Sequence, residues 1–192
     1  MWHRLTFLVV RLTFTIMKRI PKPKPEEYAV YYNRYIDTIS EDTHILKALK
    51  EESKEFEKQL LSLSEDKLHY RYAPGKWSIK DILMHLIDCE RIFLYRALRF
   101  SRNDQTPLPF FEEDQYAMVA EADKLSIRKI VKEYKTQRAA TLAFFDNQTQ
   151  KSLKRTGIAS QAAMSVRACA WIICAHERHH RKIMEERYLG SE

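Results

Sequence analysis

Residues 165–188 read SVRACAWIICAHERHHRKIMEERY and predict one long amphipathic helix that ends before Gly190. At about 100° per residue, His176 and His180 fall within about 20° of the centre of the apolar face, whereas His179 lies about 80° to the side. The apolar side chains that define this face are Cys169, Ile172, Ile173, Ile183 and Met184. The pattern therefore predicts two buried imidazoles, one turn apart on the same helix.

Two histidines at positions i and i+4 on a buried face have the spacing with which one helix binds a metal ion. A single inward histidine is usually a hydrogen-bonded core residue, but two on one face would need separate acceptors once they leave water. We therefore interpret His176 and His180 as metal ligands and expect a third ligand from another helix.

The same residues contain a literal H-E-x-x-H motif, which in zinc peptidases supplies two ligands and a general-base glutamate. Only 12 residues follow His180, and Ile183 stands where the extended metzincin motif has glycine, so the sequence argues against a peptidase. Glu177 lies about 80° from the centre of the apolar face. It is the candidate catalytic proton acceptor beside the metal, and it could instead orient a ligand or be a solvated surface carboxylate.

A second helix is predicted from residue 78 to about residue 102, with Ser78 as its N-cap and Asp81 three positions later. His85 lies at the margin of its apolar face, about 60° from Ile82, and we interpret it as the third metal ligand. Cys89 lies one turn later and is a competing ligand, since a thiolate also suits zinc, although core packing is the more common role of such a thiol.

Glu90 lies near the centre of the apolar face of this second helix. A buried carboxylate needs a partner, for which Arg138 and Arg167 are the candidates. We expect this ion pair to be structural or to support the metal ligands from behind, and not to be catalytic.

Further helices are predicted over residues 42–63 and 126–147, with connections short enough to join neighbouring helices. The chain of 192 residues has only 3 glycines and 31% charged residues, which favours long amphipathic helices over sheets with many tight turns. We therefore expect an all-α fold, a four-helix bundle, over residues 26–192.

Residues 1–25 are expected to form an N-terminal extension outside this domain. Residues 1–16, MWHRLTFLVVRLTFTI, read as an appended segment, either a misassigned start with Met17 as the native start, which we favour, or a disordered extension. The proline residues that follow predict an extended, non-helical lead-in: Pro21, Pro23 and Pro25.

The formal net charge of +7 is concentrated in residues 1–25, because residues 26–192 hold 27 basic and 26 acidic residues. This near-neutral body predicts no nucleic-acid partner. No run approaches the roughly 18 apolar residues of a membrane span, so no membrane association is expected. Three cysteines, none in a C-x-x-C pair, fit a reducing cytoplasm.

Residues 71–104, RYAPGKWSIKDILMHLIDCERIFLYRALRFSRND, together with residues 165–188, resemble the DinB/YfiT-like family of small bacterial four-helix proteins. The features that carry the resemblance are W-S-x-K-D and His85 on one helix, then two histidines four residues apart on the last, and it extends over nearly all of residues 17–189. The resemblance implies a metal triad of His85, His176 and His180, often in a homodimer, that binds a divalent ion such as zinc or nickel. Relatives of this kind include thiol S-transferases that use bacillithiol, mycothiol-dependent isomerases and metal hydrolases.

Three neutral imidazoles leave coordination positions open, which is typical of a catalytic metal site. We therefore expect a metal-dependent enzyme that activates a thiol or water for transfer to, or hydrolysis of, a small molecule. The loop 103–116, with Phe110, Phe111 and Tyr116, is expected either to form an apolar rim at the substrate entrance or to cap the bundle. The alternative function is a non-enzymatic, metal-binding and dimerising stress-related protein.

Overall fold

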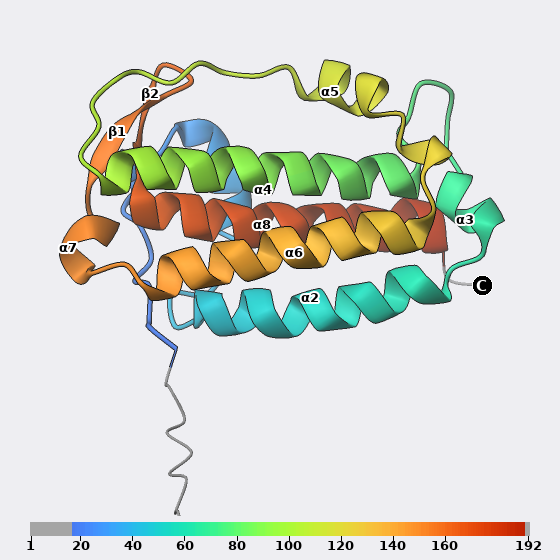
Figure 1. Cartoon of the computed structure of the whole chain (residues 1–192), viewed down its shortest axis with the longest axis horizontal. Coiled ribbons are helices and arrows are strands. Elements are labelled where there is room, and N and C mark those ends of the chain that lie inside the picture. The colour runs from blue at the N-terminus through green and yellow to red at the C-terminus, as the bar shows by residue number, and fades with distance from the viewer. Residues whose placement is uncertain (1–16, 191–192) are drawn as a thin grey trace, which may run out of the picture.

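The computed structural model describes residues 17–190, and four long helices form its body (Figure 1). Each helix agrees with the predicted one to within a few residues, and the predicted four-helix bundle is confirmed. The four are α2 (Ile45–Ser62), α4 (Ile79–Ser101), α6 (Ile127–Asp146) and α8 (Val166–Met184).

Short elements connect these helices and cover the ends of the bundle. The α-helical ones are α1 (Asn33–Ile36), α3 (Glu65–His69), α5 (Glu113–Ala120) and α7 (Gln150–Leu153). The 3-10 turns are η1 (Pro25–Glu27), η2 (Val30–Tyr32) and η3 (Ala122–Lys124), and a π-helical turn, η4 (Glu185–Leu189), extends α8. A two-stranded antiparallel hairpin of β1 (Thr156–Ala159) and β2 (Ala162–Ser165), which the sequence analysis did not predict, leads directly into α8.

The order of the helices around the bundle differs from that of a simple up-and-down bundle. α4 packs against α6 and α8, and α2 packs against the same two helices. The colour order in Figure 1 shows that α4 and α6 run in the same direction, because residues 102–126 return along the length of the bundle before α6 begins. The expectation that short connections join neighbouring helices is therefore wrong for this pair, which is linked by a crossover.

The predicted extension over residues 1–25 overlaps the described residues only from residue 17 onward. Ile20 is 1% exposed, and its carbonyl accepts a hydrogen bond of 3.2 Å from the Trp171 indole. The backbone N–H of Lys18 donates to Asp146 at 3.0 Å. This part of the chain therefore packs on the bundle, and the domain begins before residue 26. The predictions for residues 1–16 lie outside the described residues.

The lead-in has no helix up to Lys24, as its prolines predict, but Pro25 occupies the first position of the 3-10 turn η1. Proline is tolerated there because the first N–H of a helix has no partner inside the helix.

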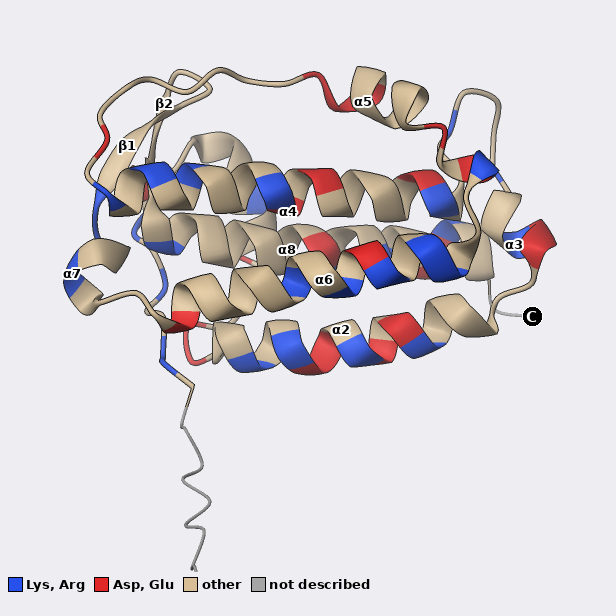
Figure 2. Ribbon diagram, in the orientation of Figure 1, with Lys and Arg blue, Asp and Glu red and all other residues tan. Residues whose placement is uncertain are grey.

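Charged residues of both signs are interleaved along α2 and α6 (Figure 2). Between residues 17 and 190, no helix combines the length and the apolar character needed to cross a lipid bilayer. All three cysteines are free and buried.

Candidate metal centre

The two helices that carry the candidate ligands begin at well-defined caps. At the start of α4, Ser78 Oγ accepts from the backbone N–H of Asp81 at 3.1 Å, and the Asp81 carboxylate accepts from the backbone N–H of Ser78 at 2.9 Å. At the start of α8, Ser165 Oγ accepts from the backbone N–H of Ala168 at 3.0 Å. These caps satisfy backbone donors that have no partner inside the helix and fix where each helix begins.

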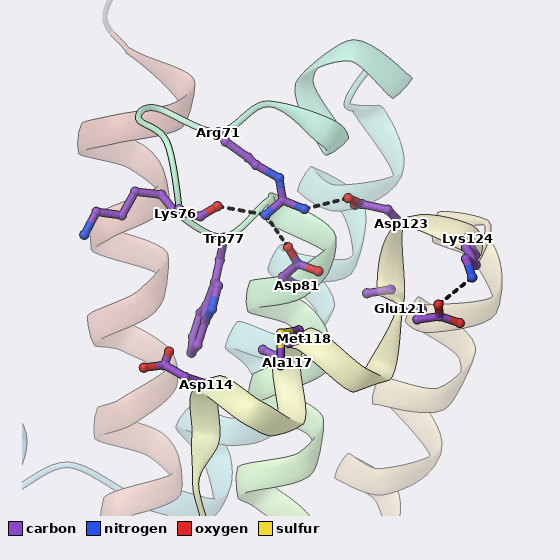
Figure 3. A pocket seen from close by; sticks show the side chains of 12 residues that line it. Arg71, Lys76, Trp77, Asp81, Asp114, Ala117, Met118, Glu121, Asp123 and Lys124 are labelled. Atoms are coloured by element: carbon purple, nitrogen blue, oxygen red, sulfur yellow. Dashed lines mark hydrogen bonds and ion pairs between the residues drawn. The ribbon is translucent and has the colours of Figure 1, made fainter.

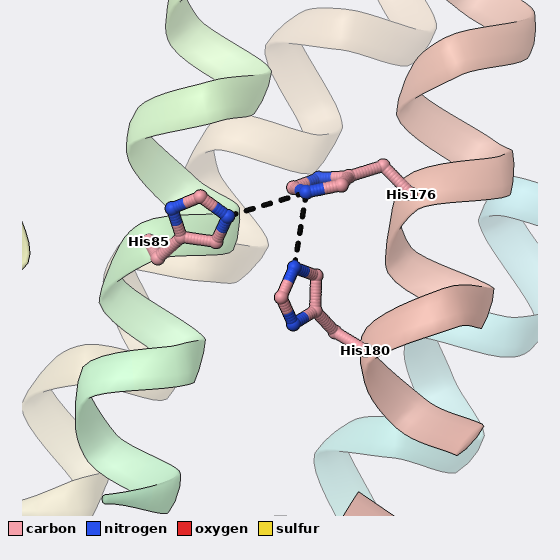
Figure 4. A group of neighbouring side chains, drawn as sticks. All are labelled: His85, His176 and His180. Atoms are coloured by element: carbon pink, nitrogen blue, oxygen red, sulfur yellow. Dashed lines mark hydrogen bonds between the residues drawn. The ribbon is translucent and has the colours of Figure 1, made fainter. Parts of the chain in front are cut away.

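The structure brings together the three histidines that the sequence analysis selected (Figure 4). His85 extends from α4, and its Nε2 atom lies 3.2 Å from Nε2 of His176 on α8. Nε2 of His180, one turn further along α8, lies 3.0 Å from the same atom. Nitrogen ligands at about 2.1 Å from one ion lie roughly 3–3.5 Å apart, so these two separations fit a common cation. All three rings offer a nitrogen atom within 4.8 Å of the others.

Burial keeps these imidazoles neutral. It lowers the pKa of His85 to about 4 and, together with the neighbouring imidazoles, lowers the pKa of His180 to about 3. The pKa of His176 lies well below its usual value, first because of burial and then because of the charges that its neighbours would carry. Neutral imidazole is the form that offers a lone pair to a metal, so the site is prepared for a cation near pH 7.

Two aromatic side chains that the sequence analysis did not select lie against this cluster. The half-buried Trp77 lies 4.6 Å from His85 and stacks on His180 at 6.3 Å, measured between ring centroids. On another side, the buried Tyr35 of α1 contacts His176 edge to face at 5.8 Å. The sequence feature that could have drawn attention to Trp77 is its position directly before Ser78, the N-cap of α4.

Cys89 is placed beside the cluster but outside the set of three. Its Sγ atom lies 3.6 Å from Nε2 of His85, and burial raises the pKa of its thiol. A neutral thiol is a poor metal ligand, so the structure favours core packing for Cys89.

Glu177 lies in a buried network rather than at the surface. Its Oε2 atom accepts hydrogen bonds from the Tyr134 hydroxyl at 2.8 Å and from the Arg138 guanidinium. The guanidinium also binds both oxygens of Glu90, at 2.8–3.2 Å. The alternative of a solvated carboxylate is therefore wrong, because residue 177 faces α6. An oxygen already engaged by two donors does not favour the predicted role of proton acceptor.

The partner of Glu90 is thus Arg138, one of the two candidates, whereas Arg167 pairs with Glu27. Burial alone would lower the pKa of Arg138, but the charges of Glu177 and Glu90 outweigh that effect and raise this pKa well above its usual value. The pairing is confirmed, and its role stays a prediction.

The remaining sequence candidates are not part of the set of three, although the ring of His179 lies 5.3 Å from that of His180 between centroids. His179 stays outside the cluster and packs on Tyr35 at 4.9 Å between ring centroids. Phe110 and Tyr116 are 61% and 49% exposed, whereas Phe111 is partly buried, packs against the hydrophobic core and lies 5.4 Å from Tyr116 between ring centroids. The capping alternative therefore fits Phe111 but not the two exposed side chains. Within residues 17–190, the non-histidine rings that contact the cluster are Trp77 and Tyr35.

The fold and the histidine cluster together define a helical-bundle protein with a candidate metal centre between two of its helices. Residues 48–184 match the family model of the DinB superfamily. The chain belongs to this superfamily, and the resemblance seen in the sequence is confirmed.

Individual relatives support the same grouping. A protein of Oceanobacillus iheyensis named "Putative metal-dependent hydrolase OB0413" is 24% identical over 151 residues, which cover 74% of this chain and 83% of that protein. YfiT from Bacillus subtilis, described as a probable metal-dependent hydrolase with an unusual four-helix bundle topology, matches with a TM-score of 0.64 at 14% identity, over 83% of this chain and 87% of that chain. A mycothiol-dependent maleylpyruvate isomerase matches with a TM-score of 0.59 at 10% identity, over 80% of this chain and 62% of that chain. At these identities, the two structural matches establish a shared fold.

Proposed function

We propose that this protein is a divalent-metal-dependent enzyme that activates a thiol or a water molecule for transfer to, or hydrolysis of, a small molecule. The observation that carries the proposal is the convergence of three neutral imidazoles from α4 and α8. Nε2 of His176 lies 3.2 Å from Nε2 of His85 and 3.0 Å from Nε2 of His180. Two relatives described as metal-dependent hydrolases support it, and so does the related fold of a mycothiol-dependent isomerase.

The donor set fits a divalent transition metal. Imidazole nitrogen suits zinc and nickel, our candidates for the ion. Among the described residues, the cluster contributes three ligands and no fourth, an arrangement that keeps a position open for a reactant. When bound there, such an ion supplies a Lewis acid that lowers the pKa of a coordinated thiol or water toward neutrality.

The chain itself orients the ligands and limits access of water. His176 and His180 share one helix, which fixes their separation, and His85 approaches from the antiparallel α4. Trp77 and Tyr35 pack against the rings and reduce the solvent around the reacting atoms. A site of lower polarity strengthens the electrostatic interactions made inside it.

Metal analysis of single variants tests the site. We expect about one equivalent of zinc or nickel in the wild-type protein and its loss in His85→Ala, His176→Ala and His180→Ala. His179→Ala is the matched control, because this histidine lies on the same helix outside the cluster and should leave the metal content unchanged. Unchanged stoichiometry in all three variants would remove the proposed centre.

Turnover assays then separate the possible reactions. We propose bacillithiol or a related low-molecular-weight thiol as the cosubstrate of the transferase reaction, with monochlorobimane as a test electrophile and a nitrophenyl ester for hydrolysis. Activity that disappears with a chelator and in the three histidine variants supports the enzyme. One bound metal without thiol or ester turnover would instead favour the alternative, a non-enzymatic metal-binding protein.

We further propose a cytoplasmic homodimer without a nucleic-acid partner. The interleaved charges of α2 and α6 support the absence of such a partner, since phosphate binding requires a concentrated basic surface (Figure 2). Light scattering during gel filtration tests the dimer, which should have twice the chain mass of 22.9 kDa.

A further inference from the structure

A cavity of about 640 Å³ lies beside the first turn of α4 (Figure 3). Its walls come from the segment between Arg71 and Trp77, from α5 and from η3. Ala117 and Met118 of α5 supply apolar surface. The volume is in the range of sites that bind small organic molecules.

Trp77 belongs both to this cavity and to the histidine cluster. Its indole lines the cavity, and its centroid lies 4.6 Å from that of His85. Asp81, which also lines the cavity, precedes His85 by one turn of α4. A molecule in the cavity would thus be separated from the imidazoles by a single side chain.

The charges around the cavity are largely paired. Arg71 donates to Asp81 and to Asp123, both at 2.6 Å, and Lys124 pairs with Glu121 at 2.5 Å. The fourth lining carboxylate is Asp114, which is exposed and for which the described residues provide no ion-pair partner.

Lys76 is the remaining cation of the lining, and it does not neutralise Asp114. Its ammonium lies 5.9 Å from the ring of Tyr72, and Figure 3 shows its side chain extending away from the group around Arg71. Asp114 and Trp77 line the same cavity. A free carboxylate and an aromatic face that line one cavity together favour an organic cation.

We propose that this cavity binds the amine-bearing, apolar end of the substrate. The inference rests on the proposed function, because it assigns the non-reacting part of the molecule, whose reactive group would have to extend past the Trp77 ring to reach the three histidines. Asp114 would pair with the ammonium, the Trp77 face would cover it, and the apolar body would contact Ala117 and Met118.

Calorimetric titration of the metal-free protein tests the proposal with two probes of similar size, phenethylamine and 3-phenylpropionate. We expect the amine to bind at least tenfold more tightly than the acid, and its affinity to fall as salt is added. Asp114→Asn should weaken amine binding about threefold to tenfold, the range of an exposed ion pair and its cation–π neighbour. Trp77→Leu should weaken it by a similar factor.

The control is Asp37→Asn, which removes another exposed carboxylate, at the end of α1, and should leave amine binding unchanged. Equal binding of the two probes, no binding of either, or an Asp114→Asn variant that matches wild type would each overturn the proposal. The experiment is independent of the metal assay. If the amine binds but the protein holds no metal in the metal assay, the cavity proposal is supported and the proposed function is contradicted. If metal binds but the amine is not preferred over the acid, the proposed function is supported and the cavity proposal is contradicted.

Discussion

Arg138 is the residue that connects the interior of all four long helices. It extends from α6 and binds Glu90 of α4 and Glu177 of α8. Its Nη1 atom also donates to the carbonyl of Leu49 in α2, at 3.0 Å. The side chains of Arg138 and of both acidic partners are at most 4% exposed. Removal of this one cation would leave two buried carboxylates without a counter-charge.

Arg138→Met should therefore lower the free energy of unfolding by about 3–5 kcal/mol, because an uncompensated buried charge is costly. The control is Arg91→Met, which breaks a partly exposed pair with Glu133 and should cost less than about 1 kcal/mol. Urea denaturation measures both. An Arg138→Met variant as stable as the control would contradict this account of the network.

Helical periodicity identified the three histidines, because angle around a helix decides which residues face inward. The same reasoning could not determine the environment of Glu177, since a residue off the core-facing stripe can meet solvent or a neighbouring helix, here α6. Helical periodicity also left Arg138 and Arg167 as two possible partners for Glu90, since it does not show which helices are neighbours. Trp77 and Tyr35 lie outside the long helices, where no periodicity indicates their direction.

Among the secondary-structure elements, the long helices were predictable and the hairpin was not. Ser78 and Ser165 are strong caps, and both begin helices as expected. The hairpin turns at Ser160 and Gln161, which adopt φ angles of 51° and 66°. Asn-Gly is the usual signal for such a turn, so this sequence gives little indication of it.

The hairpin packs closely on α4 at Gly157. A Cβ atom at this position would lie 2.1 Å from the ring of the fully buried Phe100. Gly157→Ala should therefore lower the free energy of unfolding by about 1–3 kcal/mol through overpacking. Thermal or urea denaturation measures the change.

The matched test adds Phe100→Leu, which removes the ring that the new methyl group would meet. In the double variant the two losses should be less than additive, since one substitution relieves the other. Strict additivity would show that the close approach of Gly157 to Phe100 is not the cause.

For the molecule as a whole, the buried His85 makes metal-free stability depend on pH. The pKa of His85 is lowered from 6.5 to about 4 in the folded protein. Below pH 6.5 the unfolded chain therefore binds protons that the folded chain excludes, and the free energy of unfolding falls as the pH drops toward 4. The shift corresponds to a loss on the order of 3 kcal/mol for this residue.

Denaturation of chelator-treated protein between pH 7.5 and pH 4.5 measures this dependence. His85→Gln serves as the comparison, because the difference in stability between wild type and variant isolates one imidazole from the carboxylates that titrate nearby. That difference should shift in favour of the variant as the pH falls. A difference that stays constant over this range would contradict the neutral, buried state of His85.

The packing arrangement of the helices was the least predictable feature of the structure. Amphipathic patterns identify which face of a helix is buried, but not which helices are neighbours or in which direction each runs. The crossover between α4 and α6 therefore had no signal in the periodicity. The bundle class was predictable because four such faces can be buried together in few ways.

The crossover divides the molecule into two portions of similar make-up. Before it lie α2, α4 and the single histidine at position 85, and after it lie α6, α8 and the pair at positions 176 and 180. Neither portion holds all three histidine rings, so a chain cut within residues 102–126 would regain the histidine cluster only if the two fragments reassembled. Under the proposed function, binding of a metal ion by the mixed fragments would therefore report that they have associated.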